Sequence, residues 1–271
     1  MSEESDTQSG PRTGWELDAP DTDTAMRQFL QAQTAFQRLS GESLGATVVE
    51  TERYIAVDTG RPASMVNFGL LRQPIDAANI DQRMNELEDI FGRRDATGFV
   101  ALYSPMPTPD LSTWGWNLAG HPPMQLRSPC SPAVPTDTRI ERVRSNEDLA
   151  NLERIMIEGF DFQEMRGAAA GSLFSPRLLE DDRFGAWLGY RQDEPVAAAG
   201  SMVEAGIVDV VMVATVPAAR RMGLGLAVTQ AATRPELGLP AVLFSSDEGR
   251  PVYERLGYMP ILRGSFWYRE R

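Results

Sequence analysis

The pattern of hydrophobic and polar positions predicts a mixed α/β sheet in the second half of the chain. Residues 207–215 form a near-continuous apolar run rich in valine, which is typical of a strand buried on both faces. Residues 146–160 carry apolar side chains at helical spacing. The other expected elements are strands over 138–145, 184–191, 195–203, 241–246 and about 260–268, and helical segments over 177–183, about 225–233 and 251–256.

The first half repeats this order at a constant offset. A shift of 142 residues (240 − 98), without gaps, brings residues 98–116 onto residues 240–258. The same shift lays an apolar strand, 63–71, over the strand around Asp209, and a helical segment, 80–91, over the helix that begins near Met222. Few matched positions are identical, but one offset holds across strand, helix, strand and helix. We therefore expect two similar mixed sheets in tandem; the alternative is two unrelated α/β layers of similar size.

Proline and charge suggest where the parts of the chain begin and end. Residues 1–24 contain seven acidic residues and one arginine, which is typical of a flexible, solvated tail. Residues 121–137 are rich in proline and are expected to be a linker without a helix or a central strand. This leaves a first domain over 25–120 and a second over 138–271.

Composition excludes several classes of protein. The net charge of −12 argues against a nucleic-acid-binding face, which would have to be basic. No apolar stretch is long enough to span a membrane, and the first residues do not have the pattern of a secretory signal. A single cysteine, Cys130, and a single histidine, His121, exclude an internal disulfide and a Cys/His zinc site. We expect a soluble, cytoplasmic monomer or homodimer without a metal, in which His121 has a surface or interdomain packing role.

The segment after the valine-rich strand is a candidate anion site. Pro217 ends the strand, and the residues Arg-Arg-Met-Gly-Leu-Gly (220–225) lead directly into a helix. The N–H groups and partial positive charge of a helix N-terminus attract anions, and glycines let a phosphate approach the backbone. Arg220 and Arg221 could add charged hydrogen bonds. Taken alone, the glycines could equally serve the turn.

A second motif makes the anion site more specific. Tyr253 follows the next buried strand and lies four residues before Gly257. The two motifs together, R-x-x-G-x-G and Y-x-x-x-G-[FY], resemble those of the GNAT superfamily of acyl-CoA-dependent N-acyltransferases. The resemblance covers residues 138–271.

The GNAT resemblance implies an acetyl-CoA site in the second domain. It gives Tyr253 the role of the general acid that protonates the departing thiolate. The preceding strand would splay from its neighbour, so that the backbone of Val213, Ala214 and Thr215 pairs with the pantetheine arm. The pyrophosphate would lie on the turn and the first helical residues, and further cofactor contacts would come from Ser246; the turn and helix positions are Arg220, Arg221, Met222, Gly223, Leu224, Gly225 and Leu226.

Asp209 is the candidate general base. An acceptor amine is an ammonium at neutral pH and must lose a proton before it attacks a thioester. Some histone-type members of the superfamily carry a glutamate eleven residues before the first residue of the pyrophosphate motif, and Asp209 stands eleven residues before Arg220. The resemblance thus implies a base that acts through water; the alternative is a structural ion pair with an arginine. Glu204 and Glu164 are weaker candidates.

The segment after the first helix of the second domain could bind the acceptor. Phe160, Phe162, Met165 and Phe174 could line an apolar pocket, in which Asp161 or Glu164 would meet an ammonium. Such residues are equally compatible with a structural core. The sequence does not identify the acceptor beyond an amine, which we expect to be a small molecule.

The first half lacks the residues of the motifs. At the constant offset, Ala78 takes the position of Arg220, Asp81 and Arg83 those of the two glycines, and Leu111 that of Tyr253. An aspartate at a helix N-terminus repels a pyrophosphate, so the first half is expected to be a degenerate copy, in an arrangement similar to that of the mycothiol synthases. We therefore expect an N-acetyltransferase in which the amine attacks acetyl-CoA directly in a ternary complex, since no cysteine lies near the motifs. The alternative is a non-catalytic acyl-CoA-binding or interaction module.

Overall fold

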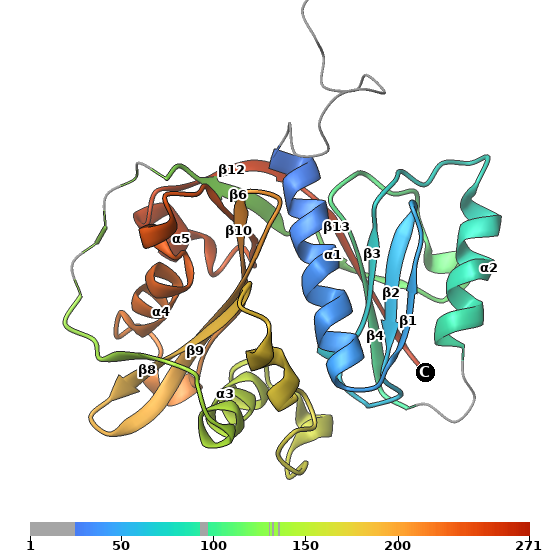
Figure 1. Ribbon diagram of the computed structural model, residues 1–271. Helices are drawn as coiled ribbons and strands as arrows, with labels where there is room; N and C mark the ends of the chain where they lie inside the picture. The colour runs from blue at the N-terminus through green and yellow to red at the C-terminus, as the bar shows by residue number, and fades with distance from the viewer. Residues whose placement is uncertain (1–24, 93–96, 130, 132, 135) are drawn as a thin grey trace, which may run out of the picture.

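The computed structural model describes residues 25–92, 97–129, 131, 133–134 and 136–271 (Figure 1). The acidic segment 1–24 and Cys130 therefore lie outside the described residues. Within the described part, the chain forms two mixed β-sheets that face each other across a helix, as Figure 1 shows. None of the described helices combines the length and the apolar character needed to cross a membrane.

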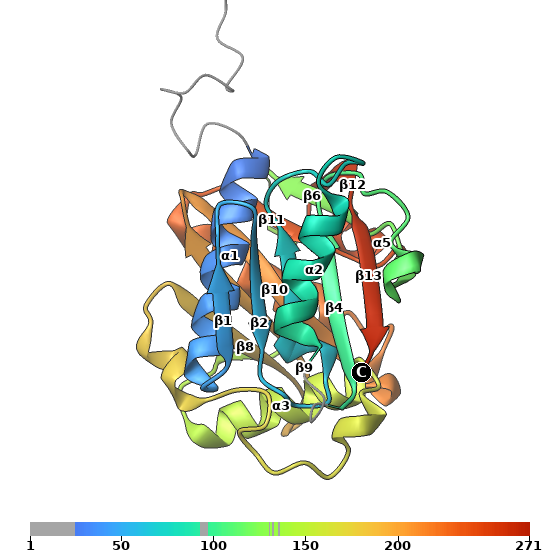
Figure 2. The same ribbon diagram turned by 90° about the vertical axis from the view of Figure 1, so that its right-hand side faces the viewer.

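The first sheet is built mostly from the N-terminal half. Its strand order is β1-β2-β3-β4-β13-β5, and β3 and β4 are its parallel pair. Helix α2 (Ile80–Phe91) covers its outer face, as Figure 2 shows, and buries Met84, Leu87 and Phe91. The strands are β1 (Thr47–Glu50), β2 (Tyr54–Asp58), β3 (Asn67–Leu71), β4 (Phe99–Ser104), β5 (Asn117–Gly120) and β13 (Ser265–Glu270).

The second sheet is built mostly from the C-terminal half. Its strand order is β12-β6-β11-β10-β9-β8-β7, and the parallel pair is β10 with β11. Helix α3 (Asn146–Gly159) begins at a capping box, in which Ser145 and Asp148 exchange hydrogen bonds between side chain and backbone. The other elements are β6 (Pro123–Arg127), β7 (Ile140–Arg142), β8 (Phe184–Arg191), β9 (Glu194–Glu204), β10 (Ile207–Thr215), α4 (Leu224–Ala232), β11 (Ala241–Phe244), α5 (Arg250–Arg255) and β12 (Tyr258–Arg263).

The two halves exchange one strand each. Strand β6 belongs to the first half in sequence but lies between β11 and β12 of the second sheet, whereas β13 lies between β4 and β5 of the first sheet. The first residues of the two strands, Pro123 and Ser265, are 142 residues apart (265 − 123), the offset found in the sequence. The predicted duplication is therefore confirmed, and it extends to the exchanged strands.

Two sequence predictions are corrected by this exchange. The stretch 121–137 is not a linker throughout, because β6 is an internal strand; Pro123 is its first residue, where no ladder N–H is needed, and the next four residues carry no proline. The last expected strand, near 260–268, is two strands separated by Gly264, and the second of them leaves the sheet. Each exchanged strand is anchored at its end: Arg127 donates to the carbonyl oxygen of Leu256 at 2.8 Å, and Arg271 forms a buried ion pair with Asp58 at 2.7 Å.

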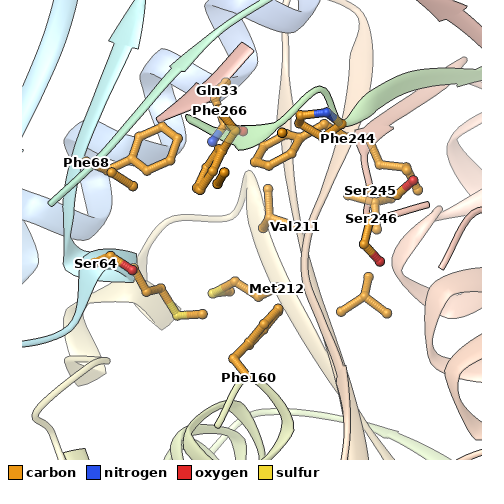
Figure 3. A pocket seen from close by; sticks show the side chains of 18 of the residues that line it. Gln33, Ser64, Phe68, Phe160, Val211, Met212, Phe244, Ser245, Ser246 and Phe266 are labelled. Atoms are coloured by element: carbon orange, nitrogen blue, oxygen red, sulfur yellow. The ribbon is translucent and has the colours of Figure 1, made fainter. Parts of the chain in front are cut away.

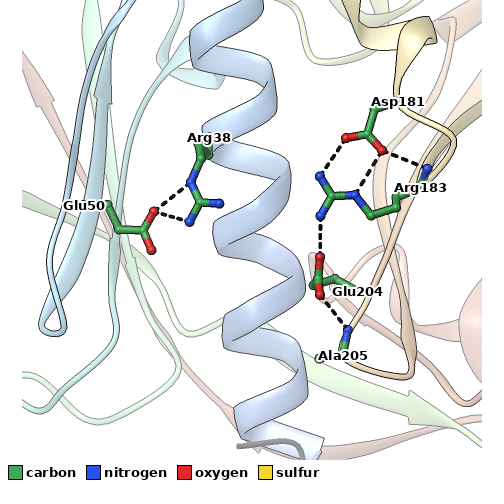
Figure 4. Close-up of polar contacts among 6 residues, drawn as sticks. All are labelled: Arg38, Glu50, Asp181, Arg183, Glu204 and Ala205. Carbon is green, nitrogen blue, oxygen red and sulfur yellow. Dashed lines mark hydrogen bonds and ion pairs between the residues drawn. The ribbon is translucent and has the colours of Figure 1, made fainter.

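Helix α1 (Ala25–Ser43) fills the space between the two sheets. The ring of Phe29 packs edge-on against both Tyr103 of β4 and Phe244 of β11, at 6.1 and 6.4 Å between centroids. Tyr103 and Phe244 stack on each other at 4.6 Å. Figure 4 shows the polar contacts on the two sides of α1: Arg38 with Glu50, and Arg183 with its partners in the second half. The sheets therefore share one interdomain core.

Candidate functional site

Strand β10 separates from β11 halfway along its length. The two strands pair in register only at Val208 and Asp209, and β10 then continues to Thr215. A β-bulge lies between Val211 and Ala214, and Met212 within it has a φ of +55°. Beyond the bulge, Ala214 and Thr215 pair with β9 on one side. On the other side no described strand pairs with β10, so that its backbone edge is open, as the sequence resemblance implies.

The open edge leads into a glycine turn at the start of α4. Gly223 is the N-cap residue, with a φ of +82°, and no side chain caps the helix. A Cβ at Gly223 would meet no protein atom within 4 Å, so the space beside this turn is free for a ligand. Leu224 and Leu226 are buried, hence only their backbone is available at the turn. Since no side chain caps the helix, the first N–H groups of α4 are left without a side-chain acceptor.

Arg220 holds the turn in place. Its guanidinium donates to the carbonyl oxygen of Gly159, at the end of α3, at 2.8 Å and to that of Thr215 at 3.3 Å. Arg221 has a φ of +62° and is exposed, as is Met222. Arg220 thus connects the end of β10, the end of α3 and the glycine turn.

Tyr253 lies in α5 and is buried, with only 8% of the residue exposed. Its ring packs edge-on against Tyr258 at 6.2 Å. Burial raises the pKa of Tyr253 to about 12, so the phenol keeps its proton at neutral pH. No hydrogen bond joins its hydroxyl to any described residue. Ser246 lies nearby in the chain, and its Oγ accepts a hydrogen bond from the N–H of Gly249 at 3.1 Å.

A cavity of about 580 Å³ lies between the two halves, and both of them line it. Val211, Met212 and Val213 of β10 form part of its wall together with Ser246 and Tyr253. Figure 3 shows Ser64 and Phe68 of the first half on one side of this space and Ser245 and Ser246 on the other. The open strand edge and the buried phenol therefore border one cavity.

Asp209 lies beneath this wall and not on it. Its side chain is fully buried, and neither carboxyl oxygen has a hydrogen-bond partner in the structure. The arginine ion pair considered for it is not formed with any described residue. Burial raises the pKa of Asp209 well above the usual range of an aspartate.

Asp209 should make the stability of the protein depend on pH. Because its pKa is raised, the folded protein retains this proton to a higher pH than the unfolded chain does. The free energy of unfolding should therefore fall as the pH rises above about 4, the unfolded-state value. Asp209→Asn removes the titration and breaks no hydrogen bond. In urea unfolding, we expect the variant to exceed the wild type in stability at pH 8, with the difference disappearing near pH 4. A pH-independent difference would contradict this.

The structure divides the other sequence candidates. Phe160 and Phe162 line the cavity, and their rings stack at 5.7 Å. Met165 and Phe174 are each 2% exposed and belong to the hydrophobic core, so they have the structural role that was the alternative to acceptor binding. Asp161 and Glu164 do not line the cavity; Asp161 pairs with Arg166 on the surface at 2.6 Å, and Glu164 is exposed.

Glu204 is also remote from the proposed chemistry. It pairs with Arg183, which Asp181 also holds, as Figure 4 shows. Along β9 it lies opposite Ile207, at the end of β10 farthest from Thr215. It therefore does not approach the open strand edge.

Sequence reasoning missed the part of the cavity that the first half provides. Gln33 from α1, Ser64 from the turn Ser64–Val66 and Phe68 from β3 all line it. No motif marks these residues. His121 also lines the cavity; it is exposed, and its Nδ1 lies 3.1 Å from the carbonyl oxygen of Gly264, which agrees with the surface role considered for it.

The corresponding place in the first half is closed. Strands β3 and β4 pair in register through Leu70, one residue before β3 ends, so that β3 keeps no long open edge. Helix α2 carries Asp81 in its first turn, and Arg83 there is buried beside Glu86. Leu111, at the position corresponding to Tyr253, is fully buried.

Within the described residues, no group of three or more histidine, cysteine, aspartate or glutamate side chains is arranged to hold a metal ion. The cavity is instead bordered by part of β10, by Tyr253 and by mostly uncharged side chains, whereas the N-terminus of α4 follows the end of β10 and is not among the lining residues.

Comparison with known proteins identifies the fold. No protein-family model matches the sequence, and no curated protein matches it. Among solved structures, a GCN5-related N-acetyltransferase from Kribbella flavida is similar with a TM-score of 0.60 and 22% identity, over 87% of this chain and 95% of that one. A functionally unknown conserved protein from Staphylococcus epidermidis is similar with a TM-score of 0.59 and 12% identity, over 84% of this chain and 95% of that one. A GCN5-related N-acetyltransferase from Sphaerobacter thermophilus is similar with a TM-score of 0.51 and 12% identity, over 89% of this chain and 92% of that one.

These likenesses span both halves of the chain. Because every identity is below 25%, they concern the fold and not the reaction. The chain has the GNAT fold in a tandem arrangement, with two mixed sheets of related strand order.

Proposed function

We propose that the C-terminal half transfers an acetyl group from acetyl-CoA to a primary amine by direct attack. The observation that carries this proposal is the arrangement of the site along one strand: β10 borders a cavity together with Tyr253, its edge is open beyond the pairing with β11, and the uncapped glycine turn of α4 follows its end. In the reaction, the amine nitrogen forms a bond to the acetyl carbon, and the bond from that carbon to sulfur breaks.

The residues of the second half have distinct roles in this proposal. The uncapped N–H groups at Gly223 and the following residues bind the pyrophosphate, with Arg221 beside them. The edge of β10 that faces away from β9, over Val213, Ala214 and Thr215, pairs with the pantetheine amides, and Ser246 contributes to the cavity wall that Val213 also lines. Tyr253 donates its proton to the sulfur as the thiolate departs.

Asp209 is proposed as the base, acting through water because it does not border the cavity. The burial that raises its pKa brings this carboxyl closer to the pH at which proton transfer from an ammonium becomes effective. Asp209→Asn should therefore lower turnover most at pH values above the pKa of Asp209 and well below that of the amine, where the carboxylate is available and little free amine is present. The loss should shrink as the pH approaches the pKa of the amine. The pH–rate profile of both proteins measures this, with acetyl-CoA affinity unchanged.

If the acidic limb of the pH–rate profile is the same in the wild type and in Asp209→Asn, Asp209 has no part in the mechanism. Of the described residues that line the cavity, His121 would then be the next candidate for the base. His121→Gln serves as the comparison variant, since it keeps a hydrogen-bonding side chain beside Gly264.

The first half is proposed to have lost its own cofactor site. The closed β3–β4 pair, the acidic residue at the start of α2 and the buried Leu111 all support this. One acetyl-CoA per chain is therefore expected by calorimetry.

The test of the whole proposal is release of the coenzyme A thiol with a library of amines. Turnover that depends on the amine supports the enzyme. One equivalent of bound acetyl-CoA with no release for any amine would instead favour the alternative, a non-catalytic acyl-CoA-binding module.

A further inference from the structure

The cavity extends beyond the groups proposed to hold acetyl-CoA. The strand edge, the glycine turn and Tyr253 all come from the second half, whereas Gln33, Ser64, Met65 and Phe68 line the cavity from the first. These first-half residues face the cavity from the side opposite Ser246, as Figure 3 shows for Ser64 and Phe68. A volume of about 580 Å³ falls within the range of small-molecule sites. The first half therefore supplies the wall for a second, small ligand.

The cavity wall has very little charge. None of the described residues that line it is an arginine, and Asp247 is the only carboxylate among them. Asp247 is already paired with Arg263 at 2.6 Å, and two-thirds of its side chain is exposed. A ligand carboxylate or phosphate would find no arginine here, and a second ammonium would find no free acid. Burying such a group without a partner is costly.

The remaining surface is largely aromatic and aliphatic. Phe68 of β3 and Phe266 of β13 lie 6.4 Å apart between ring centroids, and Phe244 of β11 lies 6.5 Å from Phe266. Met65 and Phe160 also line the cavity and add to this apolar surface. These side chains can enclose a flat ring or a short alkyl chain, which gains from the loss of apolar surface to water.

Two uncharged polar groups interrupt the apolar wall. Gln33 is 2% exposed, and its side-chain oxygen has no hydrogen-bond partner in the structure. The hydroxyl of Ser245, also buried, is unpartnered as well. A buried polar group without a partner is unfavourable until a ligand supplies one. Both residues line the cavity, so rotation of either side chain would bring its buried oxygen to an N–H or O–H group of a ligand.

We infer that the acceptor is a small primary amine on an aromatic or alkyl body that carries no other charge, and that the first half of the chain selects this body. This inference rests on the proposed acetyltransferase function. It gives the degenerate half a role in the reaction: it binds no cofactor but forms the apolar side of the acceptor site.

Matched acceptors test the inference through thiol release with saturating acetyl-CoA. 2-Phenylethylamine and phenylalanine share an aromatic body and differ by a carboxylate, whereas hexylamine and spermidine are alkyl amines that differ in additional ammonium groups. We expect kcat/KM for 2-phenylethylamine and hexylamine to exceed that for their charged counterparts by at least about tenfold. Equal or better turnover of phenylalanine or spermidine would overturn the acceptor class and leave the acetyltransferase proposal standing. No release with any amine would overturn both.

Substitutions of Met65 test the role of the first half. Met65→Glu places a carboxylate on the wall, and we expect it to lower the ratio of kcat/KM for 2-phenylethylamine to that for spermidine by at least about tenfold. Met65→Leu should keep the wild-type ratio. Met259→Glu is the control, because Met259 is a 62% exposed methionine on β12 that does not line the cavity. Acetyl-CoA affinity should be unchanged in all three, and a ratio unaffected by Met65→Glu would show that the first half does not select the acceptor.

Discussion

Replacing Tyr253 by phenylalanine is expected to lower turnover by about 10²-fold, the low end of the range for general acid catalysis. The thiol of coenzyme A has a pKa near 8.5, so a proton donor assists its departure at neutral pH. The raised pKa of Tyr253 keeps its hydroxyl protonated for this purpose. The substitution retains the ring and its packing on Tyr258, and no described residue loses a hydrogen bond. Stability and acetyl-CoA affinity should therefore change little, as calorimetry and thermal unfolding can establish.

Tyr258→Phe is the matched control for this variant. Tyr258 is also buried, but its hydroxyl is 2.9 Å from the hydroxyl of Thr233, and it does not line the cavity. Loss of the Tyr258 hydroxyl should lower the stability of the protein and leave turnover unchanged. If Tyr253→Phe retained full turnover, thiolate departure would need no acid here. If it abolished acetyl-CoA binding, the hydroxyl would be a ligand contact and not a proton donor.

Replacing Gly223 by leucine is expected to weaken acetyl-CoA binding at least about tenfold, or ~1.4 kcal/mol. The new side chain would occupy the free space beside the N-terminus of α4, where the pyrophosphate is proposed to bind. Leucine at the positive φ of this position also strains the backbone, by about 1–2 kcal/mol. Calorimetric titration with acetyl-CoA measures the loss of affinity.

Gly238→Leu separates these two effects. Gly238 has a φ of +62° and, like Gly223, no protein atom within 4 Å of a Cβ, but it lies after the end of α4 and not at its N-terminus. Both variants should lose similar stability, and only the one at Gly223 should lose acetyl-CoA affinity. Unchanged affinity in a folded Gly223→Leu protein would remove the main support for a pyrophosphate site at this turn.

The parts of the site that the sequence predicts are those defined by local patterns. The expected strand over 207–215 has the bounds of β10, because an unbroken apolar run needs burial on both faces. The expected helix over 146–160 corresponds to α3, whose start is set by the side chain of Ser145. The glycine turn and Tyr253 lie on the elements predicted for them. Each of these signals lies within a few residues of the structure that it specifies.

The parts that could not be predicted depend on distant contacts. Helix α1 lies between two sheets, so its polar residues Gln33 and Gln37 are buried together with its apolar ones, and the helix sequence alone does not indicate that a second sheet covers it. Strand β6 begins at the second of two consecutive prolines, which concealed its pairing with β11 and β12. The acceptor side of the cavity combines α1, β3 and β13, whose proximity only the assembled sheets create. No pattern of neighbouring residues in the sequence indicates that these three elements lie close together.

The strand exchange has a consequence for how this chain is made and inherited. A nascent chain cannot complete its first sheet until residues 265–270 have left the ribosome, because β13 fills the place between β4 and β5. Neither half can therefore finish folding as a separate product, and a gene that lost one half would leave an unpaired gap in the sheet of the other. Such mutual dependence preserves both copies after duplication, whether or not each keeps its chemistry. The first copy could thus lose its cofactor site while its structure remained indispensable.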